Sequence, residues 1–111
     1  MSDPEEILVE FARRTLESLR NWRSLAAAVK EAVLRMCPDA RVYVFGSAVE
    51  GRITAASDLD VLVVCDLERE EAVRLKAEVL REVGLDAPVE MHVVDERGLS
   101  WYERSADLVE V

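Results

Sequence analysis

Two acidic side chains, Asp58 and Asp60, stand at the start of an apolar run that extends to Val64. On a β-strand, residues two positions apart point to the same side, so both carboxylates would face one surface of a sheet. Neighbouring carboxylates repel each other unless a cation lies against both, and Mg²⁺ prefers oxygen ligands of this kind. The spacing therefore predicts a site for a divalent cation. The alternative interpretation is a simple turn before a strand, because Ser57 followed by an aspartate commonly opens turns.

A Gly-Ser pair, Gly46 and Ser47, follows a shorter apolar run over residues 42–45. Glycine allows other groups to approach the backbone closely, and the serine hydroxyl and backbone N–H groups can hold phosphate oxygens. An ordinary strand-to-helix turn with Ser47 as the helix cap would orient the same N–H groups. Together with a cation held by carboxylates, this turn indicates a metal-assisted nucleotide site.

Gly46 and Ser47, followed after ten intervening residues by the pair Asp58 and Asp60, resemble the signature of the minimal nucleotidyltransferase domain. This family belongs to the polymerase-beta-like nucleotidyltransferase superfamily, and the resemblance extends over about residues 24–104. It implies that both aspartates are catalytic metal ligands for Mg²⁺, with two ions in the site and Mn²⁺ as an alternative. It also implies that the Gly-Ser turn contacts the phosphates of ATP or another nucleoside triphosphate.

Glu90 is the predicted third catalytic carboxylate and metal ligand. The superfamily places an acidic residue on a neighbouring strand, where it completes a two-metal site and takes the proton from the attacking hydroxyl. Aspartate is commoner at this position, and an exposed strand glutamate without a catalytic role is the alternative interpretation. His92 shares a strand face with Glu90 and could support the site or contact the nucleotide. A packing or surface role for this histidine is favoured.

The three residues after Ser47 depart from the family pattern. Many members carry arginines there, which would pair with the phosphates, whereas this chain has alanine, valine and Glu50. Arg52 is the predicted substitute for these arginines. Ser57, immediately before the acidic pair, completes the predicted set of nucleotide-binding residues.

Composition predicts one globular domain, because the 111 residues are half apolar and contain no repeat. The net charge of −9 argues against direct nucleic-acid binding and suits a basic protein partner. No apolar run approaches the ~20 residues that span a bilayer, and the N-terminus lacks a signal-peptide pattern, so a cytoplasmic location is expected. Cys37 and Cys65 lack the spacing of metal ligands and are expected to be reduced, buried thiols.

Hydrophobic periodicity predicts an α/β (α+β) protein with the element order α-β-α-β-α-β-α. The first helical region begins at Pro4 after the capping residue Asp3 and extends to Met36, as two helices or as one that continues past Asn21. The further elements expected are strands over residues 41–45, 58–65 and 88–94 and helices over residues 48–52, 68–83 and from Ser100 onwards.

The resemblance implies the nucleotidyltransferase fold, a small mixed β-sheet with helices packed mainly on one face. The opposite face, partly bare, would then hold the site. We expect residues 1–111 to form a single nucleotidyltransferase domain, with residues 1–22 as an N-terminal helical extension and residues 95–111 as a C-terminal helix or tail.

The activity implied by the resemblance is transfer of a nucleoside monophosphate to an acceptor hydroxyl, with release of pyrophosphate. A chain of 111 residues is expected to lack an acceptor-binding domain, so the acceptor would come from a partner or from a homo-oligomer. Minimal nucleotidyltransferases are typically encoded beside a helical HEPN ribonuclease toxin, and the leading hypothesis is an antitoxin that adenylylates this partner. The alternatives are a non-catalytic binding module with a degenerate nucleotide site and transfer to a small molecule of the aminoglycoside type.

Overall fold

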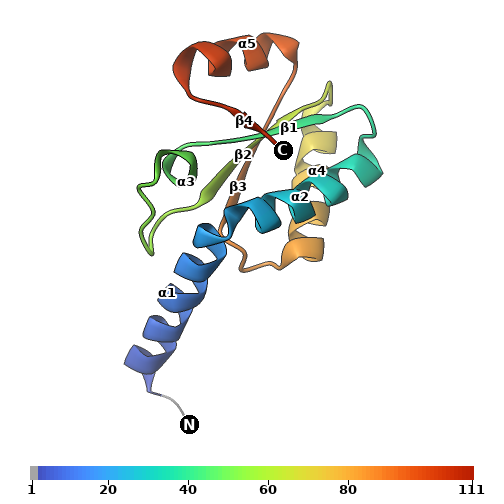
Figure 1. Ribbon diagram of the computed structural model, residues 1–111. Coiled ribbons are helices and arrows are strands. Elements are labelled where there is room, and N and C mark those ends of the chain that lie inside the picture. Colours follow the sequence, from blue (N-terminus) through green and yellow to red (C-terminus); the bar gives the residue numbers. More distant parts are fainter. Residues whose placement is uncertain (1–2) are drawn as a thin grey trace.

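The computed structural model describes residues 3–111, and its centre is a mixed four-stranded sheet with the strand order β3-β2-β1-β4 (Figure 1). β2 pairs in parallel with β3 and antiparallel with β1, which also pairs antiparallel with β4. The strands are β1 (Arg41–Phe45), β2 (Leu59–Val64), β3 (Val89–Val94) and β4 (Val109–Glu110). Met1 and Ser2, which belong to the expected N-terminal extension, lie outside the described residues.

The two faces of the sheet differ because side chains alternate along each strand. One face is apolar and packs under α2 (Trp22–Met36) and α4 (Arg69–Val83). On the other face, α5 (Glu96–Ser105) contributes Leu99 to a smaller cluster with Leu62. The fully buried side chains of the larger cluster include Val42, Val44, Val61, Val63, Leu75 and Val79. The prediction of a small mixed sheet with helices mainly on one face is confirmed.

The N-terminal helical region consists of two helices rather than one. α1 (Pro4–Arg20) begins after Asp3, whose carboxylate accepts a hydrogen bond of 2.8 Å from the backbone N–H of Glu6. It ends at Asn21, and α2 then runs in a different direction across the sheet (Figure 1). Within residues 3–111, no helix is both long enough and apolar enough to cross a membrane.

The C-terminal segment differs from the expectation in two ways. The last helix begins at Glu96 rather than Ser100, because the Asp95 carboxylate caps it by accepting a 3.0 Å hydrogen bond from the N–H of Gly98. The chain then returns to the sheet as β4, which the expected element order lacked. A two-residue strand carries too little periodicity to be recognised, so only its pairing with β1 defines it.

The expectation of two free thiols is wrong, because Cys37 and Cys65 form a disulfide. Cys37 follows the last turn of α2, and Cys65 directly follows β2. The packing of α2 against the sheet brings these two ends together, although 28 positions separate the cysteines in the sequence. Their spacing alone carries no such information, because disulfide pairing depends on the tertiary fold.

Removing this bridge is expected to destabilise the fold. A disulfide restricts the unfolded chain, and one that closes a loop of this length contributes about 2–4 kcal/mol. We expect the double variant Cys37→Ser, Cys65→Ser to lose about this much free energy of unfolding in a urea titration. A reducing agent should lower the unfolding midpoint of the natural chain and leave that of the double variant unchanged. Equal responses of the two proteins to the reducing agent would contradict the prediction.

Candidate active site

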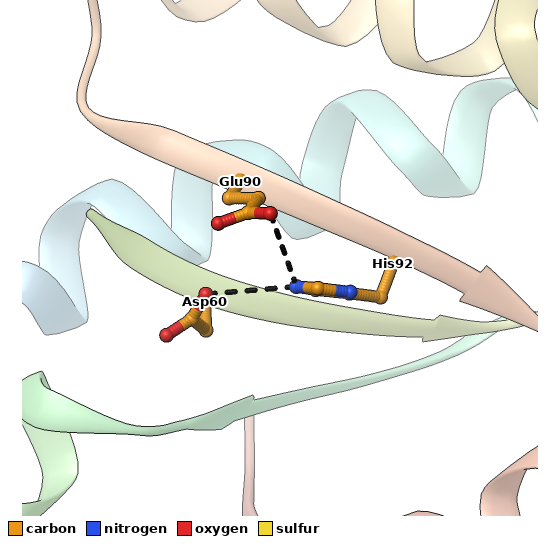
Figure 2. Close-up of side chains that lie close together, drawn as sticks. All are labelled: Asp60, Glu90 and His92. Carbon is orange, nitrogen blue, oxygen red and sulfur yellow. Dashed lines mark ion pairs between the residues drawn. The ribbon is translucent and has the colours of Figure 1, made fainter.

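The parallel pairing of β2 with β3 places three side chains with potential metal-ligand atoms on one face of the sheet. The register sets Asp60 beside Glu90 and Leu62 beside His92, while the antiparallel register sets Phe45 of β1 beside Asp60. Asp60 and Leu62 alternate along β2 with residues of the larger hydrophobic cluster, so they lie on the opposite face of the sheet. This face is the one partly covered by α5. Figure 2 shows the side chains of Asp60, Glu90 and His92 converging there.

Asp60, Glu90 and His92 each offer one ligand atom, and these three atoms lie within 4.8 Å of one another. His92 Nε2 is 3.5 Å from Asp60 Oδ1 and 3.9 Å from Glu90 Oε1 (Figure 2). This nitrogen is buried and has no hydrogen-bond partner within residues 3–111, an arrangement that costs free energy. A cation between the imidazole and the carboxylates would satisfy it, so the residues present fit a divalent metal ion.

Aromatic contacts hold His92 in this position. The Tyr102 hydroxyl of α5 lies 3.3 Å from His92 Nδ1, and the Phe45 ring lies 5.3 Å from both the His92 and Tyr102 rings, measured between centroids. Burial raises the pKa of the Tyr102 phenol, and the charges of Asp60 and Glu90 raise it further. The phenol therefore keeps its proton and can donate to Nδ1 or accept from it, whichever nitrogen carries the imidazole proton. In metal-binding histidines, the ring nitrogen that does not bind the metal is typically held by a hydrogen bond, as Nδ1 is here.

Asp60 is the residue of the cluster whose ionisation is made unfavourable by its surroundings. Burial raises the pKa of its carboxyl, nearby His92 opposes this effect, and the negative charges of Glu90 and Asp58 add to it. The Asp60 side chain is only 24% exposed, whereas that of Glu90 is 59% exposed. The ionised form of Asp60 is therefore disfavoured until a positive charge arrives beside it.

Gly46 lies directly against Asp60. Its backbone has φ +82° and ψ −152°, a conformation that is essentially restricted to glycine. A Cβ at this position would lie 2.4 Å from Asp60 Oδ2, closer than any van der Waals contact allows. The glycine thus permits both the sharp turn into α3 (Ser47–Glu50) and the close approach of the carboxylate.

Asp58 lies outside the tight cluster. It precedes β2, is exposed, and lines a shallow cleft together with Phe11 and Pro88. Its charge nevertheless acts on Asp60. The hydroxyl of Ser57 is engaged in a local turn, where it accepts a 2.9 Å hydrogen bond from the backbone N–H of Thr54. The structure therefore places both residues next to the cluster but gives neither a contact with its ligand atoms.

The remaining predicted nucleotide contacts lie around α3. Ser47 is the first residue of this four-residue helix, directly after Gly46. Arg52, predicted to replace the missing arginines, is exposed and forms an ion pair with Glu50. Its guanidinium is therefore neutralised by a neighbour rather than directed into the cluster.

Sequence reasoning placed Asp60 and Glu90 on adjacent strands. It offered His92 a supporting role without favouring it, and it did not connect Tyr102 with this cluster. The period-two pattern already set His92 on the face of Glu90, and this was the available signal. Tyr102 could not be linked to the site in the same way, because its position depends on how α5 packs over the sheet.

The nucleotidyltransferase domain family matches residues 26–110 of the chain. Among solved structures, a candidate nucleotidyltransferase from Sulfolobus solfataricus aligns with a TM-score of 0.54 and 22% sequence identity. The alignment covers 93% of this chain and 84% of that chain, and at this identity it demonstrates a shared fold alone. No curated protein sequence matches.

Replacing Gly46 with alanine is expected to damage the site, and Gly51 offers a matched control. Both glycines flank α3 with positive φ. Gly51→Ala should lose about 1–2 kcal/mol of unfolding free energy, and Gly46→Ala should lose more, because its φ and ψ are essentially restricted to glycine and its Cβ would clash. A Cβ at Gly51 meets nothing within 4 Å, so only Gly46→Ala should displace the Asp60 carboxylate. We expect Gly46→Ala to weaken Mn²⁺ binding about tenfold or more, measured by electron paramagnetic resonance. Similar Mn²⁺ affinities for the two variants would contradict this role of Gly46.

The raised pKa of Asp60 makes the stability of the metal-free protein depend on pH. Its ionisation is disfavoured in the folded state, so this destabilisation is absent below the unfolded pKa of about 4 and develops as the pH rises through the folded pKa. In a metal chelator at pH 7, Asp60→Asn should therefore melt at a higher temperature than the natural chain. The difference between their melting temperatures should shrink as the pH falls towards about 4. A difference that is constant with pH would rule out Asp60 as its source.

Proposed function

The chain belongs to the nucleotidyltransferase domain family, and we propose that it transfers a nucleoside monophosphate, AMP from ATP, to a hydroxyl group of a partner protein. The observation that carries the proposal is the convergence of Asp60, Glu90 and His92 beside Gly46, in a domain of this family. The cluster would hold a divalent cation, and the backbone turn at Gly46 would hold phosphate oxygens. Binding a nucleoside triphosphate requires both.

We propose Asp58, Asp60 and Glu90 as the catalytic carboxylates and metal ligands, with two Mg²⁺ ions as the leading choice and Mn²⁺ as the alternative. A bound ion of this kind would polarise the reacting phosphate and neutralise the leaving pyrophosphate. Asp60 and Glu90 already lie together, whereas Asp58 would have to turn towards them. His92 supplies a nitrogen next to these oxygens, and imidazole is a poorer ligand for the hard Mg²⁺ ion than for a transition-metal ion, which keeps Mn²⁺ as the alternative.

The other residues of the site would position the substrates. Gly46 and Ser47 would hold phosphate oxygens through backbone N–H groups and the serine hydroxyl, with Ser57 at the edge of the same site. Arg52 would contribute to phosphate binding only after leaving Glu50, an exchange that an exposed ion pair permits at little cost.

Glu90 is the candidate general base. Its side chain is exposed enough to meet an incoming acceptor, unlike that of Asp60. The acceptor oxygen would attack the α-phosphorus while its proton passes to the Glu90 carboxylate. The bond from the α-phosphorus to the bridging oxygen would break, and pyrophosphate would leave with that oxygen.

For the acceptor we propose a helical HEPN-type protein, which this chain would silence by adenylylation as an antitoxin. The family resemblance supports this choice, and the net charge of −9 favours a partner with a basic surface. A non-catalytic binding module is the second candidate, because the ion pair between Arg52 and Glu50 leaves the turn without the free arginines that many relatives carry. Binding of ATP that depends on a divalent ion would favour the enzyme over the binding module.

The decisive experiment is label transfer from ATP to a HEPN-type protein, in Mg²⁺ and in Mn²⁺. We expect Asp60→Ala to reduce the rate by about a hundredfold or more, since it removes a metal ligand. Asp66→Ala is the matched control, because Asp66 is an exposed aspartate beyond the opposite end of β2. It should transfer label like the natural chain. No labelled partner under any condition, or equal rates for the two variants, would refute adenylyl transfer by this site.

A further inference from the structure

The first half of α1 carries an apolar stripe that lies outside the hydrophobic core. Thr15 and Leu19 are buried, but Ile7, Leu8 and Phe11, which continue the same helical face, are 58%, 67% and 53% exposed. Figure 1 shows this half of the helix extending away from the sheet and the other helices. Large apolar side chains gathered on one helix face typically mark an interaction surface.

The charges along α1 are arranged unequally. Residues 3–10 carry four acids and no base, which gives a net charge of −4. Residues 11–20 carry three arginines and one glutamate, which gives a net charge of +2. Within the helix, Glu10 forms ion pairs with Arg13 and Arg14, but these pairs are exposed and easily exchanged for others. A second helix is therefore attracted when its basic half lies along the acidic half of α1.

We propose that α1 is a self-association surface and that two copies of this chain pair their α1 helices antiparallel. With Phe11 of one copy opposite Ile7 of the second copy, residues 3–6 of each copy lie opposite residues 12–15 of the other. This register sets the first acids of each helix against Arg13 and Arg14 of its mate. A parallel pair would instead place like charges opposite each other along the whole helix, which is unfavourable.

A cleft beside α1 provides additional contact surface. It has a volume of about 310 Å³ and is lined by Phe11, Arg14 and Thr15 on the helix and by Ala87 and Pro88 on the facing turn. In the antiparallel register, the first turn of the second copy lies over this cleft, where its apolar side chains become covered. The helix is about 25 Å long, so the interface is at the small end of the usual range and a weak, micromolar dimer is expected.

Substitution of Phe11 tests the apolar contact. Sedimentation velocity of the full chain should give a dimer at tens of micromolar concentration. Phe11→Glu should raise the dimer dissociation constant at least about thirtyfold, because it removes the central apolar side chain. Val73→Glu is the matched control: Val73 is 61% exposed on α4, away from α1, and this variant should dimerise normally. A natural chain that stays monomeric, or a dimer that tolerates Phe11→Glu, overturns the proposal.

Charge reversal tests the orientation. Glu5→Arg with Glu6→Arg, and separately Arg13→Glu with Arg14→Glu, should each weaken the dimer about tenfold. Combining all four changes in one chain should restore the affinity, because opposite charges then meet again in the antiparallel register. If the variant with all four substitutions dimerises more weakly than either double variant, the antiparallel arrangement is overturned. These substitutions lie on an exposed helix, and circular dichroism of each variant monitors its helical content.

Discussion

The free-energy cost of ionising Asp60 is the constraint to which the rest of the site is matched. Its carboxylate is largely buried, lies against Gly46 and faces the negative charge of Glu90 across the parallel strands. Ionising such a group destabilises the fold, and burial on the apolar face of the same sheet offsets this cost. Val61 and Val63 of β2 and Met91 of β3 pack beneath α2 and α4, so the two strands that carry the acids are fixed from behind. The site can therefore be preorganised although its own charges oppose the arrangement.

α5 links the open face of the sheet to the core. Leu99 anchors it on Leu62, and this contact brings Tyr102 to His92 and shields the imidazole from solvent. The helix thereby removes water from one side of the cluster while Glu90 remains accessible on the other. This division suits a reaction in which one carboxylate must stay in place and another must meet an incoming substrate. The two-residue β4 has a related role, because it leads the chain from α5 back to the edge of β1.

The sequence was informative wherever a local rule decides the outcome. Alternation placed Asp60, Glu90 and His92 on open faces of their strands, and the apolar run after Asp60 identified β2 as a central strand. The sequence was uninformative wherever the structure depends on contacts between segments that are far apart in the chain. The pairing of Cys37 with Cys65, the short strand β4 and the contact of Tyr102 with His92 all depend on packing between separate elements. The position of Asp58 belongs to the same class, since it precedes the strand and the strand rule does not govern its side chain.

Charge defines what kind of nucleotide site this can be. A chain with a net charge of −9 repels a nucleoside triphosphate at long range, and the local turn does not correct this because Arg52 is paired with Glu50. In the proposed site, a divalent ion held by Asp60, Glu90 and His92 would supply the positive charge that nucleotide binding needs. Nucleotide and divalent ion should therefore bind as a unit, each improving the affinity for the other. In the proposed site, the missing arginines need not abolish nucleotide binding. A bound divalent ion would then neutralise the phosphates in their place.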